Sequence, residues 1–132
     1  MRALIVDDSS FVREYLKQML ERMEVECVEA ANGREALEIL ERGPAIDVTL
    51  CDLNMPVMNG LEFLQALNAS GLRHAMQVLM ITTETEYEVI TTALALGADE
   101  FLMKPFTRDG LREKLLLLGI EDGKVNAHAL AS

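Results

Sequence analysis

Short apolar runs alternate with longer amphipathic segments along the chain, and this rhythm is the first signal of its fold. Runs that are apolar rather than alternating are typical of strands buried on both faces of a parallel sheet. We therefore predict five strands, over residues 3–6, 25–30, 48–51, 78–81 and 101–103.

The segments between these runs carry the three-to-four-residue spacing of amphipathic helices. In the first, apolar residues from Phe11 to Met23 recur at that spacing, while charged residues take the other face. Side-chain acceptors cap the predicted starts and glycines mark the ends: Ser9 or Ser10, Asn32 with Glu35, Asn59 with Glu62, then Gly43, Gly71, Gly97 and Gly119. The other four helices are predicted over about 34–42, from Asn59 to before Gly71, over 86–96, and from Thr107 to before Gly119.

Strands separated by helices predict a single α/β domain, built as a doubly wound parallel sheet covered on both faces. The length of 132 residues, half of them hydrophobic, suits one domain with a full core. Ligands of such sheets bind outside the carboxyl ends of the strands. The residues that follow each strand are therefore the first candidates for a site.

A net charge of −10 argues against binding to nucleic acid or to an anionic membrane surface, because both need a basic patch. We expect proteins or cations as partners. No apolar stretch approaches the roughly 20 residues that span a bilayer, and the first residues turn acidic too early for a signal peptide. The sequence thus predicts a cytoplasmic protein without membrane insertion, in which Cys27 and Cys51 are reduced core residues.

Chemically active residue types stand at four of the five predicted strand ends. Asp7 and Asp8 follow the first strand, Asp52 the third, Thr82 the fourth and Lys104 the fifth. Each alone is more often a turn, cap or solvated surface residue. Together they predict a site that combines carboxylates, a hydroxyl and a lysine.

The stretches "LIVDDSSFVR", "LCDLNMPVMNGLEFL", "VLMITTE" and "GADEFLMKPF" together resemble the receiver domain of two-component response regulators, most closely its CheY-like single-domain type. The likeness covers residues 1–119 and leaves 120–132 as a short flexible tail. It implies a (βα)5 flavodoxin-like sheet with strand order 2-1-3-4-5. In that order the first and third strands are neighbours, which brings Asp7, Asp8 and Asp52 together.

Clustered carboxylates favour a bound cation, since two unit charges about 4 Å apart repel by roughly 4 kcal/mol at an effective dielectric near 20. Mg²⁺ prefers such oxygen ligands, and Mn²⁺ is expected to substitute. By resemblance, Asp8 and Asp52 supply carboxylate ligands, the backbone carbonyl of Asn54 a third, and Asp7 acts directly or through water. A calcium trap is the alternative, opposed by the absence of EF-hand spacing and by the nearby lysine, Lys104.

The resemblance implies that Asp52 is a nucleophile that takes a phosphoryl group from a sensor histidine kinase, or from a small acyl phosphate, as an aspartyl-phosphate. Lys104 and the metal neutralise charge on that group, and Thr82 donates its hydroxyl to it. The Lys104–Pro105 bond is cis in the family. Such a protein catalyses only its own phosphotransfer and autodephosphorylation and is not otherwise an enzyme.

The family also implies a switch in which Thr82 is coupled to an aromatic side chain, here Phe101. A plain core phenylalanine is the other reading of this residue. The switched surface comprises the fourth helix, fifth strand and fifth helix, through which a monomer controls a downstream protein target, as in chemotaxis. Asn54 and Glu84 would set the lifetime of the phosphate.

Two other functions stay open. A receiver-like adaptor would bind its partner without phosphorylation, which the complete set of acid, hydroxyl and lysine disfavours. A phosphohydrolase with an aspartate nucleophile commonly carries a second acid two residues later, where this chain has Asn54.

Overall fold

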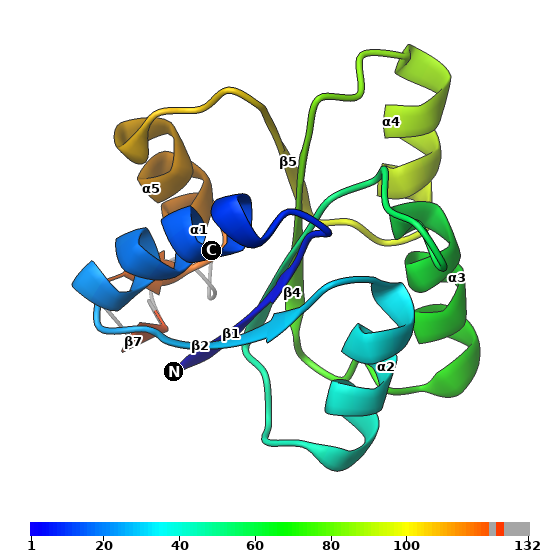
Figure 1. The fold of residues 1–132 in the computed structure, drawn as a ribbon, viewed down its shortest axis with the longest axis horizontal. Coiled ribbons are helices and arrows are strands. Elements are labelled where there is room, and N and C mark those ends of the chain that lie inside the picture. Colours follow the sequence, from blue (N-terminus) through cyan, green and yellow to red (C-terminus); the bar gives the residue numbers. More distant parts are fainter. Residues whose placement is uncertain (122–123, 126–132) are drawn as a thin grey trace.

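The fold is a five-stranded parallel sheet, seen in a computed structural model that describes residues 1–121 and 124–125 (Figure 1). The strand order β2-β1-β3-β4-β5 confirms the flavodoxin-like prediction. The strands are β1 (Arg2–Val6), β2 (Glu26–Ala30), β3 (Val48–Cys51), β4 (Gln77–Thr82) and β5 (Glu100–Met103).

Helices cover both faces of the sheet, α1 and α5 on one side and α2, α3 and α4 on the other (Figure 1). Successive residues of a strand point to opposite faces, so β1 sends Ala3 and Ile5 into one core and Leu4 and Val6 into the other. This is why the strands read as unbroken apolar runs. The helices are α1 (Ser10–Arg22), α2 (Gly33–Arg42), α3 (Gly60–Ser70), α4 (Tyr87–Ala95) and α5 (Arg108–Leu117).

The helix starts largely follow their capping residues. Ser9 rather than Ser10 caps α1, and Asn59 with Glu62 forms the complete capping box predicted for α3. The box predicted for α2 is only half formed. Asn32 accepts a hydrogen bond from the N–H of Glu35, but the Glu35 carboxylate accepts from the N–H of Ala31 instead of the N–H of Asn32.

Ordered structure continues beyond the predicted boundary at Gly119. A two-stranded antiparallel sheet pairs β6 (Ile120–Glu121) with β7 (Lys124–Val125). The side chain of Ile120 is buried in the core formed with α1 and α5. The first residue of the predicted tail thus packs into the core, and residues 122–123 and 126–132 of that tail lie outside the described part of the chain.

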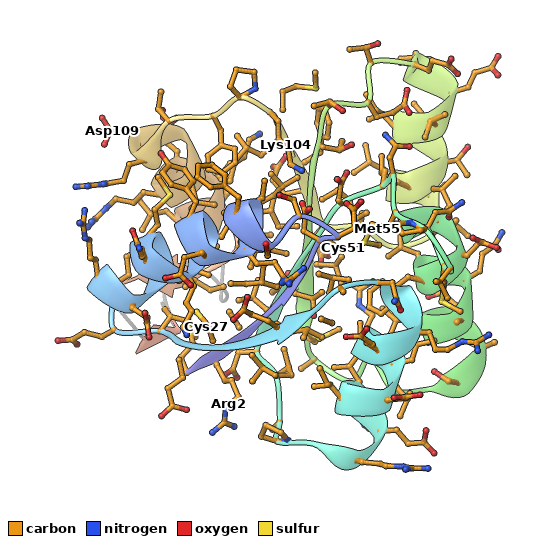
Figure 2. All side chains as sticks on the ribbon, in the orientation of Figure 1. Arg2, Cys27, Cys51, Met55, Lys104 and Asp109 are labelled. Carbon is orange, nitrogen blue, oxygen red and sulfur yellow. The ribbon has the colours of Figure 1, made fainter. Side chains whose placement is uncertain are left out.

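The two cysteines lie in different surroundings (Figure 2). Both are free thiols, as predicted: Cys51 is buried, whereas Cys27 is half-buried and packs against the edge of the core rather than inside it. Among the described residues, no helix has both the length and the apolar character needed to cross a membrane.

Candidate functional site

The register of the sheet brings the two key acids side by side. Val6 pairs with Cys51 at the carboxyl ends of β1 and β3. Asp7 and Asp52 are the next residues in the chain, so they lie side by side just beyond these two neighbouring strands. The N–H of Asp52 donates to the carbonyl oxygen of Val6 at 3.0 Å, which extends the pairing by one residue. Both aspartates are buried, with 3 % and 8 % of their surface exposed.

Lys104 bridges these two acids. Its Nζ lies 2.8 Å from Oδ2 of Asp7 and 3.0 Å from Oδ2 of Asp52. The lysine is aimed from the end of β5, where its N–H donates to the carbonyl oxygen of Thr82 and the bond to Pro105 is cis. Figure 2 shows Lys104 and Cys51, the residue before Asp52, at the same edge of the sheet.

Each carboxylate oxygen of the two buried acids has a hydrogen-bond donor. Besides the lysine, the N–H of Ser9 donates to Oδ1 of Asp7 at 2.9 Å, and the N–H of Asn54 to Oδ1 of Asp52 at 3.2 Å. These donors offset the cost of burying charge. Burial alone would lower the pKa of the Lys104 ammonium, but its hydrogen bonds and the two negative charges raise that pKa above its usual value.

The third acid, Asp8, is exposed and completes a cluster that could hold a metal ion. One oxygen each from Asp7, Asp8 and Asp52 lies within 4.8 Å of the others. With each ligand about 2 Å from an octahedral Mg²⁺, neighbouring ligands are about 3 Å apart and opposite ligands about 4 Å apart. The three oxygens would therefore have to move closer together to bind such an ion directly.

Thr82 and Glu84 form a linked turn between β4 and α4. The buried Thr82 hydroxyl accepts a hydrogen bond from the N–H of Glu84 at 3.1 Å, which leaves the hydroxyl proton for another acceptor. The Glu84 carboxylate accepts from the N–H groups of Thr85 and Glu86 at 3.1 and 3.0 Å, at the start of α4. The sequence did not indicate these contacts.

Phe101 lies on β5 opposite Met80 of β4. Met80 is buried, but Phe101 is only half-buried. The reading of Phe101 as a plain core residue is therefore wrong, and its role as a switch stays a prediction.

Gly60 is a site residue that sequence reasoning treated only as part of a helix start. A Cβ at Gly60 would lie 2.6 Å from the carbonyl oxygen of Asp52 and 2.8 Å from Cα of Leu53. Such contacts do not fit, so α3 packs against the backbone of the candidate nucleophile only because position 60 is glycine. Its N–H also donates to the carbonyl oxygen of Leu53 at 2.9 Å.

A sequence model of the response regulator receiver domain matches residues 3–116. The chain belongs to this family. The receiver fold thus accounts for the strand order and for the acids gathered at the carboxyl edge of the sheet.

Named relatives and solved structures agree with this assignment. A chemotaxis protein CheY homolog of Campylobacter jejuni is 39 % identical over 87 % of this chain and 89 % of the relative. Chemotaxis protein CheY1 of Helicobacter pylori is 40 % identical over 92 % of this chain and 100 % of the relative. The structure of chemotaxis protein CheY4 from Vibrio cholerae superposes with a TM-score of 0.80 at 37 % identity, covering 87 % and 95 % of the two chains. The structure of a CheY-like receiver domain protein from Methanospirillum hungatei has a TM-score of 0.79 at 35 % identity, covering 87 % of this chain and 90 % of that chain.

Proposed function

We propose that this response regulator accepts a phosphoryl group on Asp52 from the phosphohistidine of a sensor histidine kinase, in a reaction that depends on Mg²⁺. The observation that carries the proposal is the Lys104 ammonium, held 2.8 and 3.0 Å from Asp7 and Asp52 beside the third acid, Asp8. A carboxylate nucleophile, a fixed cation and a carboxylate cluster for a metal are the parts that such a transfer requires.

In the transfer, a carboxylate oxygen of Asp52 attacks the phosphorus and forms a new P–O bond. The P–N bond of the donor breaks, and its electron pair stays on the imidazole nitrogen. Lys104 is placed to exchange a carboxylate oxygen for a phosphoryl oxygen and so to neutralise negative charge that develops there. Thr82 donates its hydroxyl proton to another phosphoryl oxygen.

The metal would be held by Asp7, Asp8 and Asp52 together with the backbone carbonyl of Asn54, and Mn²⁺ would serve in place of Mg²⁺. When bound, the ion supplies positive charge to the phosphoryl oxygens. The N–H of Asn54 already donates to Asp52, so the loop that carries this carbonyl is tied to the nucleophile.

The output surface is proposed to be α4, β5 and α5, in which the two helices flank the edge strand β5 from opposite faces of the sheet (Figure 1). Large apolar side chains are exposed on these elements, which suits contact with a protein: Tyr87, Leu94, Met103 and Leu117. Inward movement of Thr82 would reorient Phe101 on this surface. Because the named relatives are chemotaxis proteins, we place the target in chemotaxis.

The protein is proposed to act as a cytoplasmic monomer on a protein target, without nucleic acid, and to catalyse only its own phosphorylation and autodephosphorylation. Asn54 and Glu84, each two residues after a site residue, would tune how long the phosphate lasts.

Incubation with Mg²⁺ and a small acyl phosphate, followed by intact-mass measurement, tests the proposal. We expect the wild type to gain the mass of one phosphoryl group, and Asp52→Asn, or the wild type with excess chelator, to gain none. Unchanged mass of the wild type under these conditions would favour the adaptor instead. Multiple turnover of a phosphomonoester would favour a phosphohydrolase.

A further inference from the structure

Arg13 of α1 contacts the backbone of the candidate site. Its Nη1 donates to the carbonyl oxygen of Asp7 at 2.5 Å, and its Nε donates to the carboxylate of Glu29 at 3.2 Å. Only 17 % of the Arg13 side chain is exposed. The guanidinium therefore joins α1, the residue after β1 and the strand β2.

The position of Arg13 is electrostatically unusual. It stands near the start of α1, which begins at Ser10, where the helix dipole disfavours a positive charge. Hydrogen bonds from an arginine to a backbone carbonyl and to a carboxylate are strong because the donor is charged. These two contacts offset the unfavourable location and give the side chain one fixed orientation.

The carbonyl that Arg13 contacts belongs to the peptide between Asp7 and Asp8. The orientation of this peptide sets the directions in which both carboxylates leave the backbone. On its other side, Asp7 is held by its N–H, which donates to the carbonyl oxygen of Ala30 at 3.1 Å. Arg13 thus completes the fixation of the segment that carries two of the three clustered acids.

We propose that Arg13 is a positioning residue of the metal pocket, and that Glu29 orients Arg13 for this task. The proposal rests on the proposed function, because it assumes that the pocket binds Mg²⁺. Groups that hold metal ligands in place commonly change metal affinity by about 10- to 100-fold when they are removed.

The charge of Arg13 and its positioning role predict opposite effects. A guanidinium near the pocket repels a second cation, so loss of its charge alone would tighten Mg²⁺ binding. Loss of the contact to Asp7 frees the peptide before Asp8 and weakens binding. The direction of the change therefore tells the two roles apart.

Calorimetric titration of the full chain with Mg²⁺ tests the proposal. We expect Arg13→Ala to weaken binding about tenfold, the lower end of the usual range for such groups. Arg13→Lys should restore part of the affinity, since an ammonium can donate to the carbonyl but lacks the planar fork that also reaches Glu29. Glu29→Gln, which keeps an acceptor, should weaken binding less than Arg13→Ala.

Arg22→Ala is the matched control, because it removes the same charge from the exposed far end of α1 and should leave the affinity unchanged. Circular dichroism of each variant without Mg²⁺ checks the fold, and the lysine and glutamine variants carry the test if Arg13→Ala does not fold. If the wild type binds Mg²⁺ and the Arg13 variants bind it equally tightly or more tightly, the positioning role is overturned and the proposed function is not. A wild type that binds no Mg²⁺ would overturn both this role and the proposed function.

Discussion

The Nζ of Lys104 lies 3.0 Å from Oδ2 of Asp52, although 52 residues separate the two in the chain. The same ammonium lies 2.8 Å from Asp7, so one lysine from β5 meets two acids from β1 and β3. Two buried carboxylates repel each other, and the positive charge of the lysine offsets that repulsion. Without the lysine, an incoming phosphoryl group would meet only negative charge from these residues. This relationship links the stability of the site to its proposed chemistry.

Replacing Lys104 with methionine should slow phosphorylation of Asp52 by about 100-fold or more, the usual scale for loss of one fixed group that stabilises developing charge. The rate of mass gain with an acyl phosphate measures the effect. Lys114→Met is the control, because Lys114 pairs with Glu100 at 3.0 Å and is assigned no part in the transfer. Similar rates for Lys104→Met and the wild type would remove the lysine from the mechanism.

The raised pKa of Lys104 predicts how its contribution to stability depends on pH. A group whose pKa is higher in the folded than in the unfolded state stabilises the fold fully below the unfolded value, near 10.5. That contribution is lost as the pH rises through the higher, folded pKa. We therefore measure the free energy of unfolding in urea at about pH 8 and pH 11. The amount by which the wild type is more stable than Lys104→Met should be smaller at the higher pH. A difference that grows with pH would contradict the assignment.

Asp8→Asn should separate metal binding from stability. In the absence of Mg²⁺ we expect this exposed change to stabilise the protein by about 0.5–1 kcal/mol, because it removes a like charge from the cluster. With Mg²⁺ at roughly 100 times its Kd, the wild type should gain about 2.7 kcal/mol, and the variant should gain far less. Urea unfolding with and without the ion measures both effects. Equal stabilisation of the two proteins by Mg²⁺ would exclude Asp8 as a ligand.

The sequence predicted the fold well because its signals are local and repeated. The run 48–51 is the strand β3 itself, and Asn59 with Glu62 marks the start of α3. The strand order, by contrast, came from the family resemblance, since apolar runs do not encode which strands are neighbours. The pair β6 and β7 was missed because strands of two residues are too short to show a period.

Site contacts that depend on tertiary geometry could not be read from the sequence. Arg13 looked like one more charged residue on the polar face of α1, and only its unfavourable place near the helix start could have drawn attention.

The backbone at Val57 is also unexpected, since a β-branched residue rarely adopts a left-handed φ of 70°. There the N–H of Met58 donates to the carbonyl oxygen of Pro56 at 2.8 Å, a tight turn that no residue preference indicates.

Substitutions at Asn54 and Glu84 should change the lifetime of the phosphate without preventing its formation. Asn54→Asp places a carboxylate two residues after the nucleophile, where it can accept a proton from attacking water, so we expect faster decay. Glu84→Gln should also alter decay, because it weakens the charged hydrogen bonds that hold the turn between Thr82 and the residues just before α4. Loss of phosphoryl mass after removal of the donor measures the lifetime. Decay identical to that of the wild type and of a Glu88→Gln control would refute the roles of both residues.

The most direct test of the account is chemical identification of the residue that carries the phosphoryl group. Borohydride reduces an acyl phosphate on aspartate to homoserine, which peptide mass spectrometry locates in the chain. After treatment with Mg²⁺ and a phosphodonor, we expect homoserine at position 52 in the wild type and at no position in Asp52→Asn. Homoserine at position 7 or 8 in the wild type, or its absence from a protein that has gained the phosphoryl mass, would contradict the central claim.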